Sequence, residues 1–215
     1  MHKQLLEKLM WAAIRSSQPV SCISQYVPTP PLGRTVVIGA GKAASSMAFE
    51  LEKLWPNKFI NGLVVTREGS KIACRKIDVM EASHPSPDIR SIEAGHRIKT
   101  AVSNLSENDL VVMLLSGGGS SLLCGLPDGL LLRQKQTCMN QLLMSGASIT
   151  ELNCVRKHLS TIKGGQLALT ISPAKIVNLI ISDVVSNDLS IIASGPTVGD
   201  HSTQAEARSI LKYYD

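Results

Sequence analysis

The feature that most constrains the fold is a run of six consecutive apolar residues, 110–115, which leads directly into Ser-Gly-Gly-Gly-Ser-Ser. A continuous apolar run of this length, stopped by glycine, predicts a strand that is buried on both faces. Strands of that kind are typical of parallel sheets, whose two faces are both covered by helices. Less continuous apolar segments predict four further strands, at 35–38, 63–65, 77–80 and 176–181.

Helical patterns separate these strands. Because strands and helices alternate, the sequence predicts a Rossmann-like three-layer α/β/α domain with a mainly parallel sheet. Ligands of such sheets bind beyond the carboxyl ends of the strands. Residues 18–34 contain four prolines and predict an irregular connector. Helical spacing or capping signals predict helices at 2–17, 43–54, 88–105, 119–124, 131–145, from 148 onward, and 203–213.

The composition excludes several classes of protein. The 215 residues are 44% hydrophobic with a net charge of +5, which excludes a disordered chain. No apolar run reaches the ~18 residues of a membrane span, and no secretory signal is recognisable, so we expect a cytoplasmic protein. The basic residues are spread out and only 3% of residues are aromatic, which favours a small anionic ligand over nucleic acid. Five scattered cysteines without a CxxC pair argue against disulfides and structural zinc.

The first predicted strand ends in a glycine turn that contains a lysine, Gly39-Ala40-Gly41-Lys42. With Ala44 this turn meets the loose dinucleotide-binding pattern G-x-G-x-x-A, in which a helix start presents free N–H groups to an anion. Lys42 would add a positive charge suited to a phosphate or a carboxylate. The alternative is a turn without a ligand and a solvated lysine at the start of a helix.

The loop after the 110–115 strand is a stronger candidate for binding a ligand. Its glycines allow backbone N–H groups to surround phosphate oxygens, and its hydroxyls can cap the following helix. The loop lacks the lysine of a P-loop, and a flexible loop is the alternative interpretation. The candidate residues are Ser116, Gly117, Gly118, Gly119, Ser120 and Ser121.

Charged side chains of interest occur in three further places. Arg156 and Lys163 are one heptad apart and could clamp an anion if one helix carried both, although spacing alone slightly favours a solvated basic face. Asp183 follows the 176–181 strand and Asp188 comes shortly after it. Carboxylates there suit Mg²⁺ or a substrate proton, and a helix cap is the alternative. We interpret His84, in a loop rich in proline, as incidental.

Five stretches of the sequence together resemble the class II glycerate kinases, the MOFRL-associated glycerate 2-kinase family. They occur in the family's order and span nearly the whole chain, and the fourth and fifth are distinctive. As they stand here, they are 37–43 (VIGAGKA), 82–88 (ASHPSPD), 115–120 (LSGGGS), 147–160 (ASITELNCVRKHLS) continuing to 163–165 (KGG), and 181–185 (ISDVV) with 193–197 (ASGPT).

The resemblance implies an ATP- and Mg²⁺-dependent transfer of a phosphoryl group to the 2-hydroxyl of D-glycerate. It implies catalytic roles for Lys42 and Asp183, and Mg²⁺ at Asp183 and Asp188. The residues that it places at the substrate or the nucleotide are Gly39, Gly41, Ser116, Gly117, Gly118, Gly119, Ser120, Asn153, Arg156 and Lys163.

Two departures from the family pattern modify these expectations. The family usually has Gly-Asp-Asp after Ser-Asp-Val-Val, whereas this chain has Ser186-Asn187-Asp188 and lacks one carboxylate. Family members continue into a second, MOFRL domain, which supplies an arginine to a site between the domains. This chain ends at Asp215, so we expect 1–215 to be the N-terminal domain alone, with impaired kinase activity. Its partner would be a C-terminal domain in trans or a second copy.

Two other functions stay open. An NAD(P)-dependent oxidoreductase of the hydroxypyruvate reductase type would use 39–44 as its dinucleotide turn and Glu68 for the ribose hydroxyls. A dehydrogenase does not need the second glycine loop, so this function ranks below the kinase. The third candidate is a non-catalytic, anion-binding half of a split enzyme.

Overall fold

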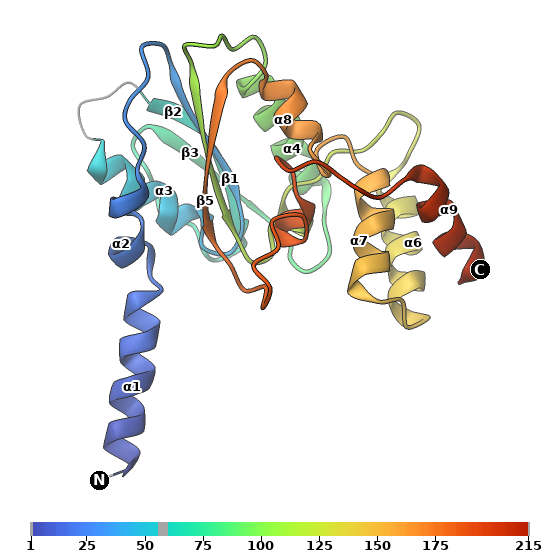
Figure 1. Cartoon of the computed structure of the whole chain (residues 1–215), viewed down its shortest axis with the longest axis horizontal. Coiled ribbons are helices and arrows are strands. Elements are labelled where there is room, and N and C mark those ends of the chain that lie inside the picture. Colours follow the sequence, from blue (N-terminus) through green and yellow to red (C-terminus); the bar gives the residue numbers. More distant parts are fainter. Residues whose placement is uncertain (1, 56–59, 215) are drawn as a thin grey trace.

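Five parallel strands form a single sheet in the computed structural model, which describes residues 2–55 and 60–214. The sheet order is β3-β2-β1-β4-β5, and each neighbouring pair is parallel. The predicted α/β class is confirmed, and the sheet, expected to be mainly parallel, is entirely parallel in the described residues (Figure 1). The strands are β1 (Thr35–Ala40), β2 (Ile60–Arg67), β3 (Ile77–Ala82), β4 (Leu110–Ser116) and β5 (Lys175–Ile181).

Helices cover both faces of the sheet (Figure 1). On one face, α3 (Ala44–Leu54) packs Met47, Ala48 and Leu51 against the strands, next to the short α2 (Pro19–Cys22). On the other face lie α4 (Ile89–Ala101), the single turn α5 (Gly119–Leu122) and α8 (Gln166–Ile171). The three-layer arrangement expected from the sequence is therefore present.

The continuous apolar run in β4 is explained by this double cover. All seven residues of β4 are buried. Val111, Met113 and Leu115 belong to the core under α4 and α8, whereas Leu110, Val112 and Leu114 belong to the core under α3. Successive side chains of a strand point to opposite faces, so a central strand needs apolar residues at every position.

A second group of helices lies beside the sheet (Figure 1). It consists of α6 (Leu132–Met144), α7 (Ile149–His158) and α9 (Gln204–Tyr213), which share a small apolar core. The predicted capping signal of α7 is present. The Ser148 hydroxyl accepts from the Glu151 N–H (3.3 Å), and the Glu151 carboxylate accepts from the Ser148 N–H (2.7 Å). Such reciprocal bonds satisfy two donors that a helix start otherwise leaves free.

The helix predicted at 2–17 is present as α1 (His2–Ser16), and it extends away from the rest of the molecule (Figure 1). None of its described residues is buried. Its apolar stripe is 40–65% exposed and comprises Leu5, Leu6, Leu9, Met10, Trp11 and Ile14. Among residues 2–55 and 60–214, no helix has the length and apolar character needed to cross a bilayer.

The structure differs from the sequence-based prediction in several places. β1 continues through Gly39, because the absence of a side chain there lets the strand lie close to the carbonyl of Leu114. The connector at 18–34 contains two short helical turns, α2 and η1 (Ser24–Tyr26). The sequence does not predict α8, whose six residues are too few to display a helical period.

A buried carboxylate joins the starts of β1 and β4 at the edge opposite to the strands' carboxyl ends. Asp109 accepts from the Arg34 N–H (2.6 Å) and the Ser106 N–H (2.7 Å), and its side chain is only 5% exposed. Arg34 and Asp109 are 75 residues apart in the sequence. Hydrogen bonds to a charged acceptor are the stronger kind, so Asp109 fixes one end of the central strand pair.

Gly95 lets α4 lie close to the backbone of Cys124, and it provides a test of this packing. A Cβ at position 95 would collide with the carbonyl oxygen of Cys124, directly after α5. Alanine favours a helix over glycine by roughly 1 kcal/mol, but overpacking against backbone costs about 1–3 kcal/mol. We expect Gly95→Ala to lower the free energy of unfolding in urea, despite its better helix propensity.

The control for this substitution is Thr100→Ala in the same helix, where the side chain is exposed. That variant should be neutral or slightly stabilising. A Gly95→Ala variant as stable as Thr100→Ala would mean that α4 does not approach Cys124 so closely.

Candidate active site

The glycine turn after β1 and the glycine loop after β4 are bonded to each other. The Ala43 N–H donates to Ser116 Oγ (2.9 Å), and the Lys42 N–H donates to the carbonyl of Gly117 (2.9 Å). A Cβ on Gly41 would collide with Ser116, so this contact requires glycine. The helices that follow β1 and β4 cover opposite faces of the sheet. This is the point in an open α/β sheet at which ligands bind.

The end of β5 brings a carboxylate to the same place. Lys42 Nζ lies 3.5 Å from the Asp183 carboxylate, and the two side chains are 47% and 62% exposed. A Cβ on Gly117 would meet that carboxylate, so the absence of a side chain at Gly117 lets Asp183 lie directly against the glycine loop. The fold thus brings the ends of β1, β4 and β5 to one edge, as the sequence predicts. A lysine and an aspartate face each other there, both open to a ligand.

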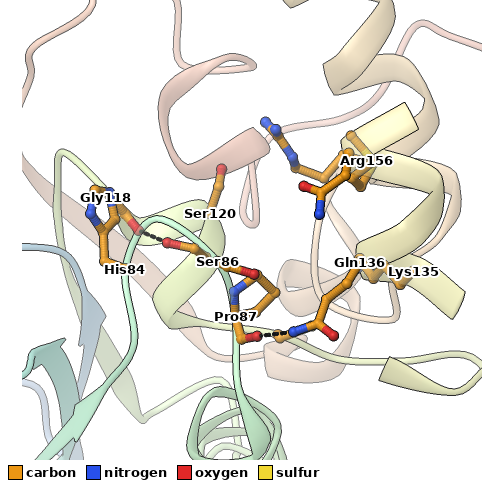
Figure 2. Close-up of a pocket in the computed structure, with 12 residues that line it drawn as sticks. His84, Ser86, Pro87, Gly118, Ser120, Lys135, Gln136 and Arg156 are labelled. Carbon is orange, nitrogen blue, oxygen red and sulfur yellow. Dashed lines mark hydrogen bonds between the residues drawn. The ribbon is translucent and has the colours of Figure 1, made fainter. Parts of the chain in front are cut away.

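Two cavities open at this edge. The larger, about 510 Å³, lies over the glycine loop and is lined by Asp183, Asn153 and the 184–186 segment. The smaller, about 170 Å³, lies between the 84–87 loop, the glycine loop, α6 and α7 (Figure 2). Three residues line both cavities and form the common wall between them: Gly118, Ser120 and Arg156.

A chain of hydrogen bonds holds this common wall. Arg156 donates to the amide oxygen of Asn153 (2.6 Å), which also accepts from the Ser194 hydroxyl (3.3 Å). The hydroxyls of Ser194 and Ser120 are 2.8 Å apart. Ala193 and Ser194 both have positive φ (51° and 61°). Such non-glycine conformations carry strain and are frequent at functional sites.

His84 is a residue that the sequence-based interpretation missed. Its ring lies against Gly118, where an added Cβ would come within 2.7 Å of it, and it lines the smaller cavity (Figure 2). Burial, followed by the positive charges of Lys42 and Arg67, holds the pKa of His84 below its usual value. The imidazole is therefore neutral near pH 7 and has a nitrogen able to accept a proton. The signal available in the sequence is its place in the 82–88 stretch, which resembles the family, but only the fold brings this loop residue to the glycine loop.

Two predicted site residues lie elsewhere. Asp188 is exposed, its carboxylate accepts from the Ser190 N–H (2.8 Å), and it lines neither cavity. Lys163 is only 2% exposed and donates to the carbonyl of Leu123 (3.0 Å). The condition for an anion clamp, one helix carrying both Arg156 and Lys163, is not met, because α7 ends at His158 and a turn follows. The favoured interpretation, a solvated basic face, is wrong for Lys163, which is buried.

Comparison with known proteins identifies the family. A family model described as "Domain of unknown function (DUF4147)" matches residues 5–215. The chain belongs to this family. It is 40% identical over 213 residues to a D-glycerate 2-kinase of Thermotoga maritima, covering 99% of this chain and 51% of that enzyme. The resemblance to glycerate 2-kinases found in the sequence is confirmed.

A further relative and a solved structure match nearly the whole chain. A protein of Agrobacterium vitis, provisionally named a hydroxypyruvate reductase, is 48% identical over 99% of this chain and 48% of its own length. The crystal structure of the T. maritima glycerate kinase matches with a TM-score of 0.90 at 40% identity, over 98% of this chain and 52% of the other. The chain thus spans about half the length of the relatives that it matches, and corresponds to their N-terminal half.

The buried Lys163 should make stability depend on pH. Burial, followed by the positive charges of Lys135 and Arg156, lowers the pKa of Lys163 to about 7. An unfolded lysine has a pKa near 10.4, so the folded state binds fewer protons between about pH 7 and 10. The free energy of unfolding should therefore rise with pH in this window, by about 2 kcal/mol from pH 7 to 9.

Lys163→Met isolates this contribution, because it keeps a long side chain but cannot titrate. The free energy of unfolding in urea should be measured at pH 7 and pH 9. Relative to Lys163→Met, the wild type should gain about 2 kcal/mol between these two pH values. Lys71→Met, at an exposed lysine, is the matched control and should follow the wild type. Parallel pH dependences of the wild type and Lys163→Met would contradict a lowered pKa.

Proposed function

We propose that this chain forms the N-terminal half of a glycerate 2-kinase site, which transfers a phosphoryl group from ATP to the 2-hydroxyl of D-glycerate. The observation that carries the proposal is the pair of Lys42 and Asp183, which face each other beside the glycine loop and a cavity of about 510 Å³. The T. maritima relative, named a D-glycerate 2-kinase, supports this function. Phosphoryl transfer depends mainly on positioning and on stabilising charge.

In the proposed reaction, the substrate hydroxyl oxygen bonds to the terminal phosphorus of ATP. The bond from that phosphorus to the bridging oxygen breaks, and ADP leaves. The hydroxyl proton goes to a base of the protein. The two candidates are Asp183, which lies against Gly117, and the neutral His84, which lies against Gly118. Lys42 stabilises the negative charge that spreads over the transferred group.

The donor set fits Mg²⁺ that is shared with a nucleotide. Mg²⁺ is usually bound by one or two carboxylates together with substrate phosphates, and Asp183 supplies one such carboxylate next to the larger cavity. In the part of the chain that the structure describes, no cluster of three His, Cys, Asp or Glu side chains could hold a metal alone. Mg²⁺ bound with ATP would neutralise phosphate charge, and Asp183 would hold it at the glycine loop.

The oxidoreductase alternative has weaker support. Its ribose-binding candidate, Glu68, is engaged in an ion pair with Arg90 (3.0 Å). The reductase name of the A. vitis relative is provisional. Calorimetry on the purified chain should show binding of ATP with Mg²⁺ and no comparable binding of NADH. Tight NADH binding without ATP binding would favour the reductase.

The Lys42–Asp183 pair is exposed, so the complete site needs a further part of the protein that covers it. Both side chains are about half open to solvent, whereas efficient phosphoryl transfer needs reactants held in place and water excluded. We propose that the additional half found in the relatives covers this edge. Kinase activity of the chain should then be weak alone and increase when the C-terminal half of a relative is added. Ligand binding that never leads to turnover would favour the non-catalytic alternative.

Lys42 offers the sharpest test of this mechanism. In an assay containing both halves, Lys42→Ala should lower kcat/KM by roughly 10²–10³, as expected for the loss of one preorganised electrostatic contact. Lys42→Arg should recover only part of this, because a planar guanidinium differs in shape and hydration from an ammonium. Lys71→Ala, at an exposed lysine, is the control. Thermal melts of all variants should stay close to the wild type; an unchanged kcat/KM for Lys42→Ala would remove Lys42 from the site.

A further inference from the structure

Three positively charged side chains lie near one another in the region between the glycine loop, α6 and α7. Lys135 and Lys163 are 3% and 2% exposed, and Arg156 is partly buried. They are close enough for the charges of Lys135 and Arg156 to lower the pKa of Lys163, after the larger effect of burial. Their acceptors include the carbonyls of Leu159 for Lys135 (2.7 Å) and Leu123 for Lys163 (3.0 Å), and the Asn153 amide for Arg156 (2.6 Å). The Cys124 side chain also interacts with Lys135.

None of these three cations pairs with a carboxylate within the described residues. Buried charges in proteins are normally paired, because an unpaired charge in a medium of low polarity is costly. The adjacent Lys157 follows that rule, since it is bound to Asp200 at 3.2 Å and both side chains are largely buried. The cluster of Lys135, Arg156 and Lys163 therefore has no acidic partner among the described residues, and burial lowers the pKa of both lysines.

The smaller cavity lies where such an anion would bind. Its lining includes Lys135 and Arg156 but no aspartate or glutamate. Gln136 also lines it and donates its amide N–H to the carbonyl of Pro87 (2.7 Å), so its amide oxygen is directed away from that bond (Figure 2). The lining of the cavity thus combines two basic side chains with the side-chain amide of Gln136.

The size of the cavity limits the ligand. Its volume of about 170 Å³ equals that of roughly five or six water molecules in the liquid. This is room for an acid of three or four carbons but not for a nucleoside triphosphate, which only the larger cavity could take.

We infer that the smaller cavity binds the carboxylate of a short hydroxy acid, with Lys135 and Arg156 as its counter-ions and Gln136 as the acceptor for one of its hydroxyls. The inference rests on the proposed function and adds to it, since it assigns the acid and the nucleotide to separate cavities. The common wall at Gly118 and Ser120 then lies between the two reactants. Lys42 and His84 both lie close to this wall, within contact distance of a side chain placed at Gly118.

Calorimetry on the purified chain tests the inference with three separate probes: D-glycerate, inorganic phosphate and ATP with Mg²⁺. The wild type should bind D-glycerate, and Lys135→Gln should weaken that binding at least tenfold, as expected for a lost hydrogen bond to a charged group. Binding of ATP should be unchanged in Lys135→Gln. Arg133→Gln removes one charge from the exposed side of the same helix and should bind D-glycerate like the wild type.

A second variant keeps the test valid if Lys135→Gln does not fold. Gln136→Leu, at a half-buried position that lines only the smaller cavity, should weaken D-glycerate binding several-fold and leave ATP binding unchanged. Equal D-glycerate binding by the wild type and these variants would overturn the inference, as would no D-glycerate binding by the wild type. Binding of phosphate alone would overturn it too, by making the cavity a phosphate site. Failure of the kinase proposal would look different: D-glycerate would bind in a Lys135-dependent manner while ATP would not bind.

Discussion

Two hydrogen bonds from backbone N–H groups of the glycine turn after β1 to the glycine loop after β4 hold the candidate site together. The Ala43 N–H donates to the Ser116 hydroxyl, and the Lys42 N–H donates to the Gly117 carbonyl. Because Gly41 allows Ser116 to lie against it, Lys42, two residues before α3, lies beside the glycine loop. Asp183 then reaches the pair because β5 lies next to β4 in the sheet. A side chain at Gly41 would separate the two turns and with them the lysine from the loop.

The distribution of charge around this edge is the second organising feature. Lys42 has a carboxylate partner that is half exposed and can be exchanged for a ligand at little cost. Lys135 and Lys163 have none, and they are buried. A ligand could replace Asp183 at Lys42, and a second negative group could serve as the counter-ion near Lys135 and Lys163. Such a site suits substrates that carry negative charge at two places, as a phosphoryl donor and a carboxylic acid do together.

Much of the fold follows from the sequence, because it depends on local patterns. The apolar run of β4 predicts a central strand, and the Ser148–Glu151 signal predicts the start of α7. The family motifs likewise point to the edge where Lys42 and Asp183 meet. The remaining features depend on tertiary structure. His84 reaches Gly118 only through the path of the chain after β3, and Lys163 is buried because α7 ends five residues before it. Residue spacing alone assumes a continuous helix and so misplaces Lys163.

The hydrogen bonds of Asp109 at the opposite edge bear on how the molecule folds. Asp109 joins the start of β4 to Arg34, 75 residues earlier in the chain, and the pairing of β1 with β4 closes a loop of that length. Contacts between residues so distant in sequence are slow to form, because the entropy of closing the loop must be lost first. Until β1 pairs with β4, the glycine turn and the glycine loop are not neighbours. A partly folded chain without this pair therefore has no ligand site. A bound substrate would therefore stabilise the completed sheet over any intermediate that lacks it.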